Sequence, residues 1–262
     1  MEIGFYDIGG QRLRVGIRRG DKARPPLLFF NGIGANIELT EPFFAAFDGP
    51  EAIVFDIPGV GGSPAPRLPY RPSTLARLTA RLLDQLGHAK VDVLGVSWGG
   101  ALAQQFAFQQ SKRCRRLILA ATSPGHLMVP GKPGVLLKMA TPRRYKDPLY
   151  FRKVAADLYG GALRHSPELA GAHLRHIKWS SDYGYYLQLA AGFGWSSLPW
   201  LSFLEQPTLV MAGTDDPIVP LINGRILAKL IPDARFVTID DGHLFLLTSA
   251  RKSAEMISEF LS

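Results

Sequence analysis

The sequence contains a single cysteine, Cys114, among its 262 residues. One cysteine excludes an internal disulfide and a thiol-rich metal site, and it agrees with a reducing cytoplasm. No apolar run approaches the roughly 18 to 20 residues that a membrane span needs. The first residues, 1–7, have neither the basic start nor the apolar stretch of a secretory signal. We therefore expect a cytoplasmic protein without a transmembrane segment.

Long runs of one charge are also missing, although the net charge is +8. The basic residues are scattered, with no run longer than pairs such as Arg115-Arg116, and no nucleic-acid motif accompanies them. This pattern argues against a nucleic-acid partner. We interpret the charge as favouring solubility and association with an anionic surface.

Apolar runs alternate with amphipathic segments along most of the chain, which suits one α/β domain carrying an insertion. Gly9-Gly10 separates two short segments that predict a hairpin at 3–6 and 12–17. Predicted strands then lie at 27–30, 52–56, 91–94, 116–121, 208–212 and 235–239, and predicted helices at 73–86 (Ser73 as N-cap), 101–108, 221–230 and 248–260. The alternation predicts a doubly wound, mostly parallel sheet.

The alternation breaks between Ser123 and Glu205, a stretch rich in proline and aromatic residues. An insertion between two strands of one sheet is typical of a cap over the carboxyl edge of the strands, where ligands bind in open α/β sheets. We predict a core formed by residues 1–122 and 206–262 and a largely helical cap formed by residues 123–205.

The stretch Gly95-Val96-Ser97-Trp98-Gly99 stands between a predicted strand and a predicted helix. This is the G-x-S-x-G pattern of the nucleophile elbow, in which a sharp strand-to-helix turn presents a serine hydroxyl at the sheet edge. The strand before it and the helix after it are the context that the pattern requires. Ser97 is therefore the predicted nucleophile.

A serine hydroxyl needs a histidine base and a carboxylate that orients the histidine. Of six histidines, only His243 follows the last predicted core strand, at the same sheet edge as Ser97. The loop after the preceding strand contains Asp215 and Asp216, and the G-x-x-D-x-x-x-P spacing favours Asp216, with Asp215 as the fallback. The other position for an acid, after residue 121, holds Thr122 and Ser123.

Backbone N–H groups must stabilise the oxyanion, and we expect them from Trp98, after the nucleophile, and from Ile33 between two glycines. The Gly32-x-Gly34 segment faintly resembles a dinucleotide fingerprint, but Ile37 occupies the third glycine position. His173 and His176 have helical spacing without a third ligand nearby. We predict no metal and no cofactor.

The predicted cap holds three of four tryptophans and six of eight tyrosines, which favours an apolar acyl pocket. Trp179, Tyr185 and Trp195 are the predicted substrate contacts. The cap also carries ten basic residues (Lys132, Lys138, Arg143, Arg144, Lys146, Arg152, Lys153, Arg164, Arg175 and Lys178) against five acids. An aromatic and basic cap suits docking on an apolar particle with anionic groups, and a solvated basic face is the alternative.

Several blocks resemble the intracellular medium-chain-length poly(3-hydroxyalkanoate) depolymerases, which are α/β-hydrolases. They are 30–36 (FNGIGAN), 55–63 (FDIPGVGGS), 95–105 (GVSWGGALAQQ), 128–133 (MVPGKP), 142–145 (PRRY), 159–161 (YGG) and 240–246 (DDGHLFL). Ser97, Asp216 and His243 match the triad positions of that family. The resemblance implies hydrolysis of ester bonds in a storage polyester at granule surfaces, with release of (R)-3-hydroxy acids.

We therefore predict a serine esterase that acts through an acyl-enzyme on medium-chain-length poly(3-hydroxyalkanoate). The first alternative is a soluble carboxylesterase or lactonase for medium-chain acyl esters. A second, from another class, is a non-catalytic granule-binding or ligand-binding protein on a hydrolase scaffold. Acyl transfer to an acceptor other than water would use the same residues.

Overall fold

The structure is a computed structural model that describes all 262 residues. Its strands are β1 (Glu2–Ile8), β2 (Gln11–Arg18), β3 (Leu27–Phe30), β4 (Ala52–Phe55), β5 (Val91–Val96), β6 (Cys114–Ala120), β7 (Thr208–Gly213) and β8 (Ala234–Ile239). Its α-helices are α1 (Glu41–Ala46), α2 (Pro72–Leu86), α3 (Trp98–Gln109), α4 (Pro133–Met139), α5 (Arg143–Lys146), α6 (Pro148–Tyr159), α7 (Pro167–His176), α8 (Asp182–Gly192), α9 (Leu221–Leu230), α10 (Phe245–Thr248) and α11 (Ala250–Leu261). Three 3₁₀ helices are η1 (Ile37–Thr40), η2 (Gly161–Arg164) and η3 (Leu198–Phe203).

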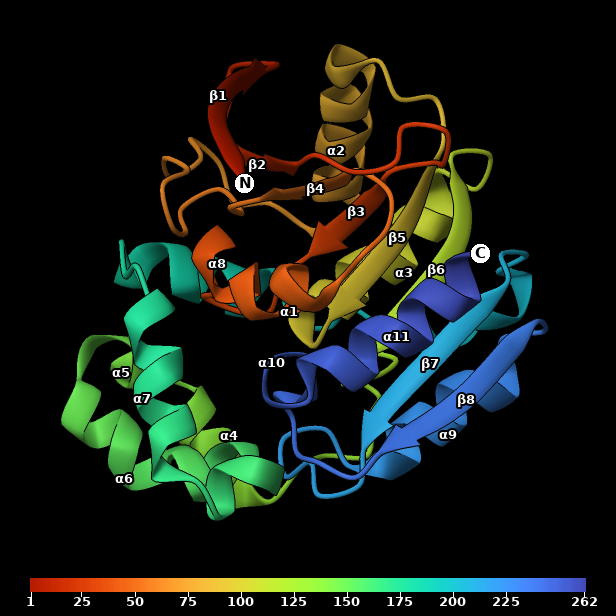
Figure 1. Cartoon of the computed structure of the whole chain (residues 1–262). Helices are drawn as coiled ribbons and strands as arrows, with labels where there is room; N and C mark the ends of the chain where they lie inside the picture. The colour runs from red at the N-terminus through yellow and green to blue at the C-terminus, as the bar shows by residue number, and fades with distance from the viewer.

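The eight strands form one twisted sheet in the order β1-β2-β4-β3-β5-β6-β7-β8 (Figure 1). β1 and β2 form the predicted antiparallel hairpin, and β2 pairs with β4 antiparallel. All pairs from β4 to β8 are parallel. The prediction of a doubly wound, mostly parallel sheet is confirmed, and the carboxyl ends of β3, β5, β6, β7 and β8 share one edge.

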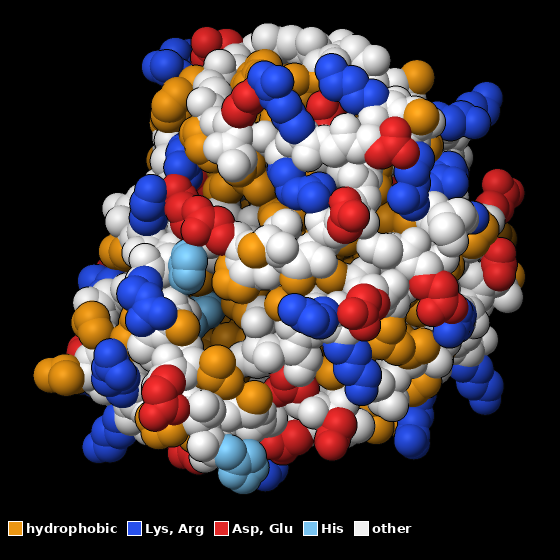
Figure 2. All heavy atoms as spheres, in the orientation of Figure 1, with side chains coloured by type: hydrophobic (Ala, Val, Ile, Leu, Met, Phe, Trp, Pro, Cys, Tyr) orange, Lys and Arg blue, Asp and Glu red, His pale blue; other side chains and the backbone are white.

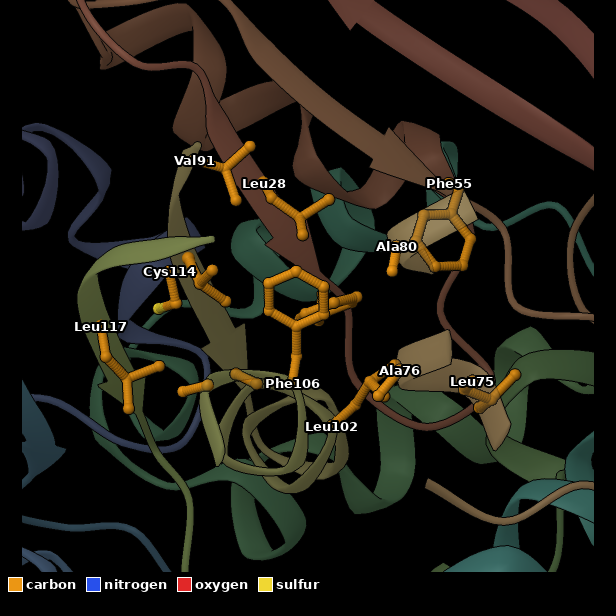
Figure 3. Close-up of a cluster of buried hydrophobic side chains, with 14 of the residues drawn as sticks. Leu28, Phe55, Leu75, Ala76, Ala80, Val91, Leu102, Phe106, Cys114 and Leu117 are labelled. Atoms are coloured by element: carbon orange, nitrogen blue, oxygen red, sulfur yellow. The ribbon is translucent and has the colours of Figure 1, made fainter. Parts of the chain in front are cut away.

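Alternate side chains of the central strands pack into two apolar layers, because successive residues of a strand point to opposite faces. Leu28 and Phe30 of β3 face the cluster that includes Leu75 of α2 and Phe106 of α3; Figure 3 shows part of this cluster. Leu27 and Phe29 belong to the opposite cluster, which includes residues of α1 and α11. Helices on both faces hold the sheet edge in place.

Three predicted helix boundaries differ from the structure. α2 begins at Pro72 with Arg71 as N-cap, not at Ser73, because proline has the backbone angle of a first helical residue. α3 begins at Trp98, directly after Ser97, since the turn passes straight into the helix. The closing helix is divided into α10 and α11 at Ser249, whose backbone leaves the helical region.

All helices from α4 to α8 lie between β6 and β7, and Figure 1 shows them gathered beside one end of the sheet. Phe151 and Leu158 of α6 belong to an apolar cluster of their own, which reaches the core at Ile218 and Val219. Leu187 of α8 packs instead with the main core cluster. We retain the division into a core (1–122, 206–262) and a cap (123–205) as a proposal. None of the helices has the length and apolar character needed to cross a membrane.

Candidate active site

Ser97 stands at the turn between β5 and α3 with φ 54° and ψ −119°, a backbone conformation that is strained for a serine. Gly95 and Gly99 make the turn sterically feasible. A Cβ on Gly99 would overlap the carbonyl oxygen of Phe30, and a Cβ on Gly95 would overlap helix α3. Thr122 Oγ1 donates a hydrogen bond of 2.6 Å to the carbonyl of Ser97. The conformation is the one that the elbow pattern predicts.

His243 and Asp216 form a buried pair from two neighbouring loops. Nδ1 of His243 lies 2.7 Å from Oδ2 of Asp216, and both side chains are almost fully enclosed. The other carboxylate oxygen of Asp216, Oδ1, accepts the backbone N–H groups of Ile218 and Val219, each at 2.9 Å. The carboxylate is therefore fixed in orientation, and it can hold the imidazole with Nε2 free to act as a base.

Asp215 points away from the imidazole. Its Oδ2 accepts hydrogen bonds from Nε of Arg164 at 2.5 Å and from the backbone N–H of Gly161 at 2.8 Å. The Arg164 guanidinium lowers the pKa of Asp215, with the Gly161 amide acting in the same direction. The loop of residues 213–219, which we call the acid loop, is therefore joined to Arg164 and Gly161 through Asp215. Only Asp216 contacts the histidine.

Ser97 and His243 both line one cavity at the carboxyl edge of the sheet. The Ser97 hydroxyl makes no hydrogen bond in the structure. Catalytic hydrogen bonds are often long in ligand-free sites and tighten when substrate binds. The structure thus places Ser97 and His243 in the wall of one cavity, with Asp216 in contact with His243 and the serine hydroxyl free of hydrogen bonds.

Asp241 secures the loop that carries His243. Its Oδ1 accepts backbone N–H groups from Gly242 at 2.7 Å and from Ala162 at 2.8 Å. Its Oδ2 accepts the hydroxyls of Thr248 at 2.7 Å and Ser249 at 2.6 Å. Sequence reasoning missed this role, since an aspartate in a turn-rich loop carries no sign of which groups it will bind.

The segment Gly160-Gly161, which we call the glycine junction, connects the end of α6 to the loops that carry Asp215 and His243. The two residues have φ values of 67° and 52°. A Cβ on Gly160 would overlap the Asp215 carbonyl, and one on Gly161 would overlap the Gly242 amide. Beside the junction, the N–H of His243 donates to the Tyr159 carbonyl at 2.7 Å. Close approach of three backbones is what requires glycine here.

The two predicted oxyanion donors are close to Ser97: Trp98 follows it in the chain, and Ile33 lines the same cavity. The Ile33 N–H has no acceptor within the protein, and Ile33 lines the cavity. Trp98 is the first residue of α3, so its N–H lacks the acceptor that one turn of preceding helix would supply. Two unpaired donors near the nucleophile suit stabilisation of a developing oxyanion.

Side chains from the predicted cap hold the Ile33 loop. The hydroxyl of Tyr145 donates to the Ile33 carbonyl at 2.6 Å. Oε1 of Gln188 accepts the Gly34 N–H at 2.7 Å, and its backbone carbonyl accepts the Trp98 indole N–H at 2.9 Å. Tyr145 of α5 and Gln188 of α8 therefore position both predicted oxyanion segments, and no local pattern in the sequence indicates these contacts.

The cavity beside Ser97 is mainly apolar, and its volume is about 70 Å³. Apolar cavities with a few polar groups in the wall are typical of binding sites for small organic ligands. Its wall is formed by Phe29, Asn31, Gly32, Ile33, Ala35, Leu39, Thr40, Val96, Ser97, Met139, Arg144, Tyr145, Tyr159, His173, His243, Leu244, Leu246 and Leu247. No aspartate or glutamate is among them.

The structure places none of the three predicted substrate contacts in this wall, and we do not carry them forward. Tyr185 is fully buried behind it, where its hydroxyl donates to the Met139 carbonyl. Trp179 stacks on the outer side of Tyr145 at 5.5 Å. The Trp195 indole N–H binds Oε1 of Gln105, away from the cavity. Aromatic content predicted the character of the cap but could not show which rings face inward.

His173 of α7 lies in the cavity wall and stacks on Phe151 at 5.2 Å. Burial, followed by the positive charges of His176 and Arg144, lowers the pKa of His173 to about 4. His176 instead contacts Oε2 of Glu41 at 3.1 Å. The two histidines thus have separate surroundings, and no group of three or more His, Cys, Asp or Glu is arranged to hold a metal ion.

The low pKa of His173 predicts a loss of stability in acid. The unfolded chain protonates this histidine as the pH falls through about 6.5, while the folded protein resists protonation until about pH 4. The free energy of unfolding therefore decreases between these values, by at most about 3 kcal/mol from this group. We expect His173→Asn to show a smaller decrease than the wild type.

Urea unfolding at pH 8 and at pH 4.5 measures this effect. His165→Asn is the matched control, because His165 is exposed and its replacement should leave the pH dependence unchanged. An acid-induced decrease that is equal in the wild type and in His173→Asn would contradict the assignment.

Comparisons with known proteins place this geometry in context. The sequence family described as alpha/beta hydrolase fold matches residues 25–250. The chain is 54% identical to a poly(3-hydroxyalkanoate) depolymerase of Ectopseudomonas oleovorans over 97% of this chain and 90% of that protein. It is 27% identical to a 3-oxoadipate enol-lactonase of Acinetobacter baylyi over 86% and 84% of the two chains. A crystal structure of an enol-lactonase from Burkholderia xenovorans superimposes with a TM-score of 0.83 at 24% identity, covering 98% and 99%. This last likeness concerns the fold alone.

Proposed function

Because the chain belongs to the α/β-hydrolase family, we propose that it is a serine hydrolase that cleaves the carboxylic ester bonds of poly(3-hydroxyalkanoate). The observation that carries the chemistry is the buried His243–Asp216 pair beside the cavity that Ser97 lines. The depolymerase relative, 54% identical over nearly the whole chain, supports the substrate. The mainly apolar cavity suits the alkyl side chains of such a polyester.

Acylation begins when Nε2 of His243 takes the proton from Ser97 Oγ. The oxygen attacks the ester carbonyl carbon, and the carbonyl electrons move onto the oxygen. The N–H groups of Ile33 and Trp98 stabilise this negative charge, while Asp216 stabilises the imidazolium. The bond to the alcohol oxygen then breaks, and His243 gives its proton to that oxygen. The acyl group remains on Ser97.

Deacylation repeats these steps with water. His243 removes a proton from a water molecule, the hydroxide attacks the acyl carbon, and the same two N–H groups stabilise the second oxyanion. The bond to Ser97 Oγ breaks, and the proton held by His243 returns to the serine. One ester bond and one water become a carboxylic acid and an alcohol.

We further propose medium-chain side chains as the preferred substrate and attachment of the protein to granule surfaces in the cytoplasm. Leu136 and Leu137 of α4, with prolines from two loops, line a groove beside the acid loop. The Leu137 side chain is 73% exposed and that of Leu149 on α6 is 80% exposed. Figure 2 shows basic side chains spread between apolar ones over the part of the molecule that α6 and α7 occupy in Figure 1. An apolar particle with anionic groups matches such a surface.

Replacing Leu136 and Leu137 with serine tests granule docking. We expect hydrolysis of medium-chain polyester granules to fall about tenfold or more, because each leucine that leaves water contributes about 1.5 kcal/mol or more. Hydrolysis of soluble p-nitrophenyl octanoate should change little, since neither leucine lines the cavity. The measurement is the release of 3-hydroxy acids beside the soluble rate.

Leu68→Ser is the matched control, because Leu68 is 77% exposed but lies on the loop before α2, outside the cap. Its granule activity should equal that of the wild type. Wild-type protein that hydrolyses the soluble ester but releases nothing from granules would favour the soluble esterase or lactonase instead. Equal loss in the Leu68→Ser variant would contradict docking through α4.

A further inference from the structure

Arg144 of α5 is a buried cation in the wall of the cavity. Its residue exposure is 1%, and it is the largest fully buried side chain in the protein. The neighbouring Arg143 lies on the outside, where it pairs with Asp147. The sequence predicts Arg144 to be one of the basic residues of a solvated or particle-facing surface, and the structure corrects that prediction. A buried guanidinium that lines the same cavity as Ser97 has to be explained.

The groups around Arg144 are polar but neutral. Nε donates to the Tyr159 hydroxyl at 3.1 Å, and Nη1 donates to the Tyr185 hydroxyl at 2.8 Å. Nη1 also donates to the Thr141 carbonyl at 3.2 Å. The guanidinium carbon lies 4.6 Å and 5.2 Å from the ring centres of Tyr145 and Tyr185. These contacts orient the cation and favour its charged form, but none of them neutralises it.

No carboxylate forms an ion pair with Arg144, and the cavity wall contains no aspartate or glutamate. His173, whose pKa is lowered by burial and by nearby positive charge that includes Arg144, is neutral near pH 7. A buried charge without a counter-ion costs several kcal/mol of folding free energy. An anion that binds in the cavity would offset this cost.

Two of the five N–H donors of Arg144, both on Nη2, have no acceptor in the protein. Nη2 is nevertheless absent from the polar atoms that are sealed from solvent without a partner. Its remaining surface therefore faces the cavity that Arg144 lines, because the residue is otherwise enclosed. A charged N–H group of this kind can donate a charge-assisted hydrogen bond to a carboxylate oxygen.

A short chain of contacts connects this donor to the reaction centre. The Arg144 guanidinium stacks over the Tyr145 ring, and the Tyr145 hydroxyl binds the carbonyl of Ile33. Ile33 carries one of the proposed oxyanion N–H groups. Arg144 and the predicted oxyanion segment are thus linked through the side chain of Tyr145.

We propose that Arg144 binds the free carboxylate at the end of a 3-hydroxyalkanoate chain, so that the enzyme cleaves the last ester bond before the carboxyl end. This inference rests on the proposed function and specifies its substrate. Ser97 bonds to the carbonyl carbon of the penultimate unit, and the bond to the 3-oxygen of the last unit breaks. His243 protonates that oxygen, which releases one 3-hydroxyalkanoate anion. Water then frees the shortened chain.

The test compares two forms of one dimer, 3-(3-hydroxyoctanoyloxy)octanoate as the free acid and as its methyl ester. For the wild type we expect kcat/KM to be about 10- to 100-fold higher for the free acid, because only its carboxylate accepts a charge-assisted hydrogen bond from Arg144. Arg144→Met should reduce this ratio to about one. Arg143→Met, which removes the same charge from the outer side of α5, should keep the wild-type ratio.

A second measurement does not depend on whether Arg144→Met folds. Ser97→Ala protein should bind 3-hydroxyoctanoate at least tenfold more tightly than methyl 3-hydroxyoctanoate in calorimetry. Equal affinities, or equal wild-type kcat/KM for both dimers, would overturn the carboxylate site while leaving the esterase intact. Undiminished hydrolysis of the methyl ester by Ser97→Ala would instead overturn the proposed function.

Discussion

Replacing Ser97 with alanine is expected to lower kcat for p-nitrophenyl octanoate on the order of 10⁶-fold. The loss follows from the geometry, because no other hydroxyl can take the place of Ser97 Oγ. The Thr122 hydroxyl donates to the Ser97 carbonyl, and the Thr40 hydroxyl donates to the Ile37 carbonyl. The residual rate should come from binding and from the oxyanion donors alone.

Steady-state kinetics with purified protein measure this loss, and thermal unfolding shows whether the variant remains folded. Removing the hydroxyl should not lower the melting temperature, since it makes no hydrogen bond. Ser111→Ala is the matched control, an exposed serine after α3. A Ser97→Ala variant with more than about one hundredth of the wild-type rate would falsify the role of Ser97 as nucleophile.

Replacing Asp216 with asparagine is expected to lower kcat about 10⁴-fold, the effect seen when a triad carboxylate becomes an amide. The asparagine preserves the shape of the side chain but removes the charge that holds His243 Nδ1–H and stabilises the imidazolium. The adjacent Asp215→Asn provides a matched comparison. It removes one charge from the same loop, but that charge faces Arg164.

We expect Asp215→Asn to retain kcat within about tenfold and to lose melting temperature, because its ion pair joins the acid loop to the cap. The two variants should therefore separate activity from stability within one loop. The opposite ranking, with Asp215→Asn the less active variant, would transfer the role of the acid to Asp215. Both rates are measured on the soluble ester, so that granule docking does not enter.

Much of the active site could be predicted because it depends on chain order and strand ends. Once 91–94 and 208–212 are identified as parallel strands, the loops that follow them must meet at one edge of the sheet. Ser97, Asp216 and His243 each follow such a strand by a few residues. The choice between Asp215 and Asp216 needed only the spacing to the proline, and the contact with His243 in the structure agrees with it.

The parts contributed by the cap could not be predicted in the same way. Tyr145, Gln188 and Arg144 act through contacts with residues over 40 positions away, and no repeat or periodicity marks the side of a short helix that turns inward. Trp179 and Trp195 had the expected chemistry but pack on other surfaces. Composition therefore predicted an apolar pocket, and only the packing of α4, α5, α6 and α7 identifies its wall.

The glycine junction bears on how this protein can be re-engineered. Hydrolases of one fold share a core, and chimeras can be designed by exchanging the cap on that core. Here the Tyr159 carbonyl accepts the backbone N–H of His243, and the Gly161 N–H donates to the Asp215 carboxylate. The proposed cap is therefore hydrogen-bonded to both loops that carry the predicted acid and base. A chimera that imports a foreign cap must therefore import residues 159–161 together with matching loops at 213–219 and 240–244. The residues that shape the cavity and the loops that carry Asp216 and His243 therefore have to be transferred together.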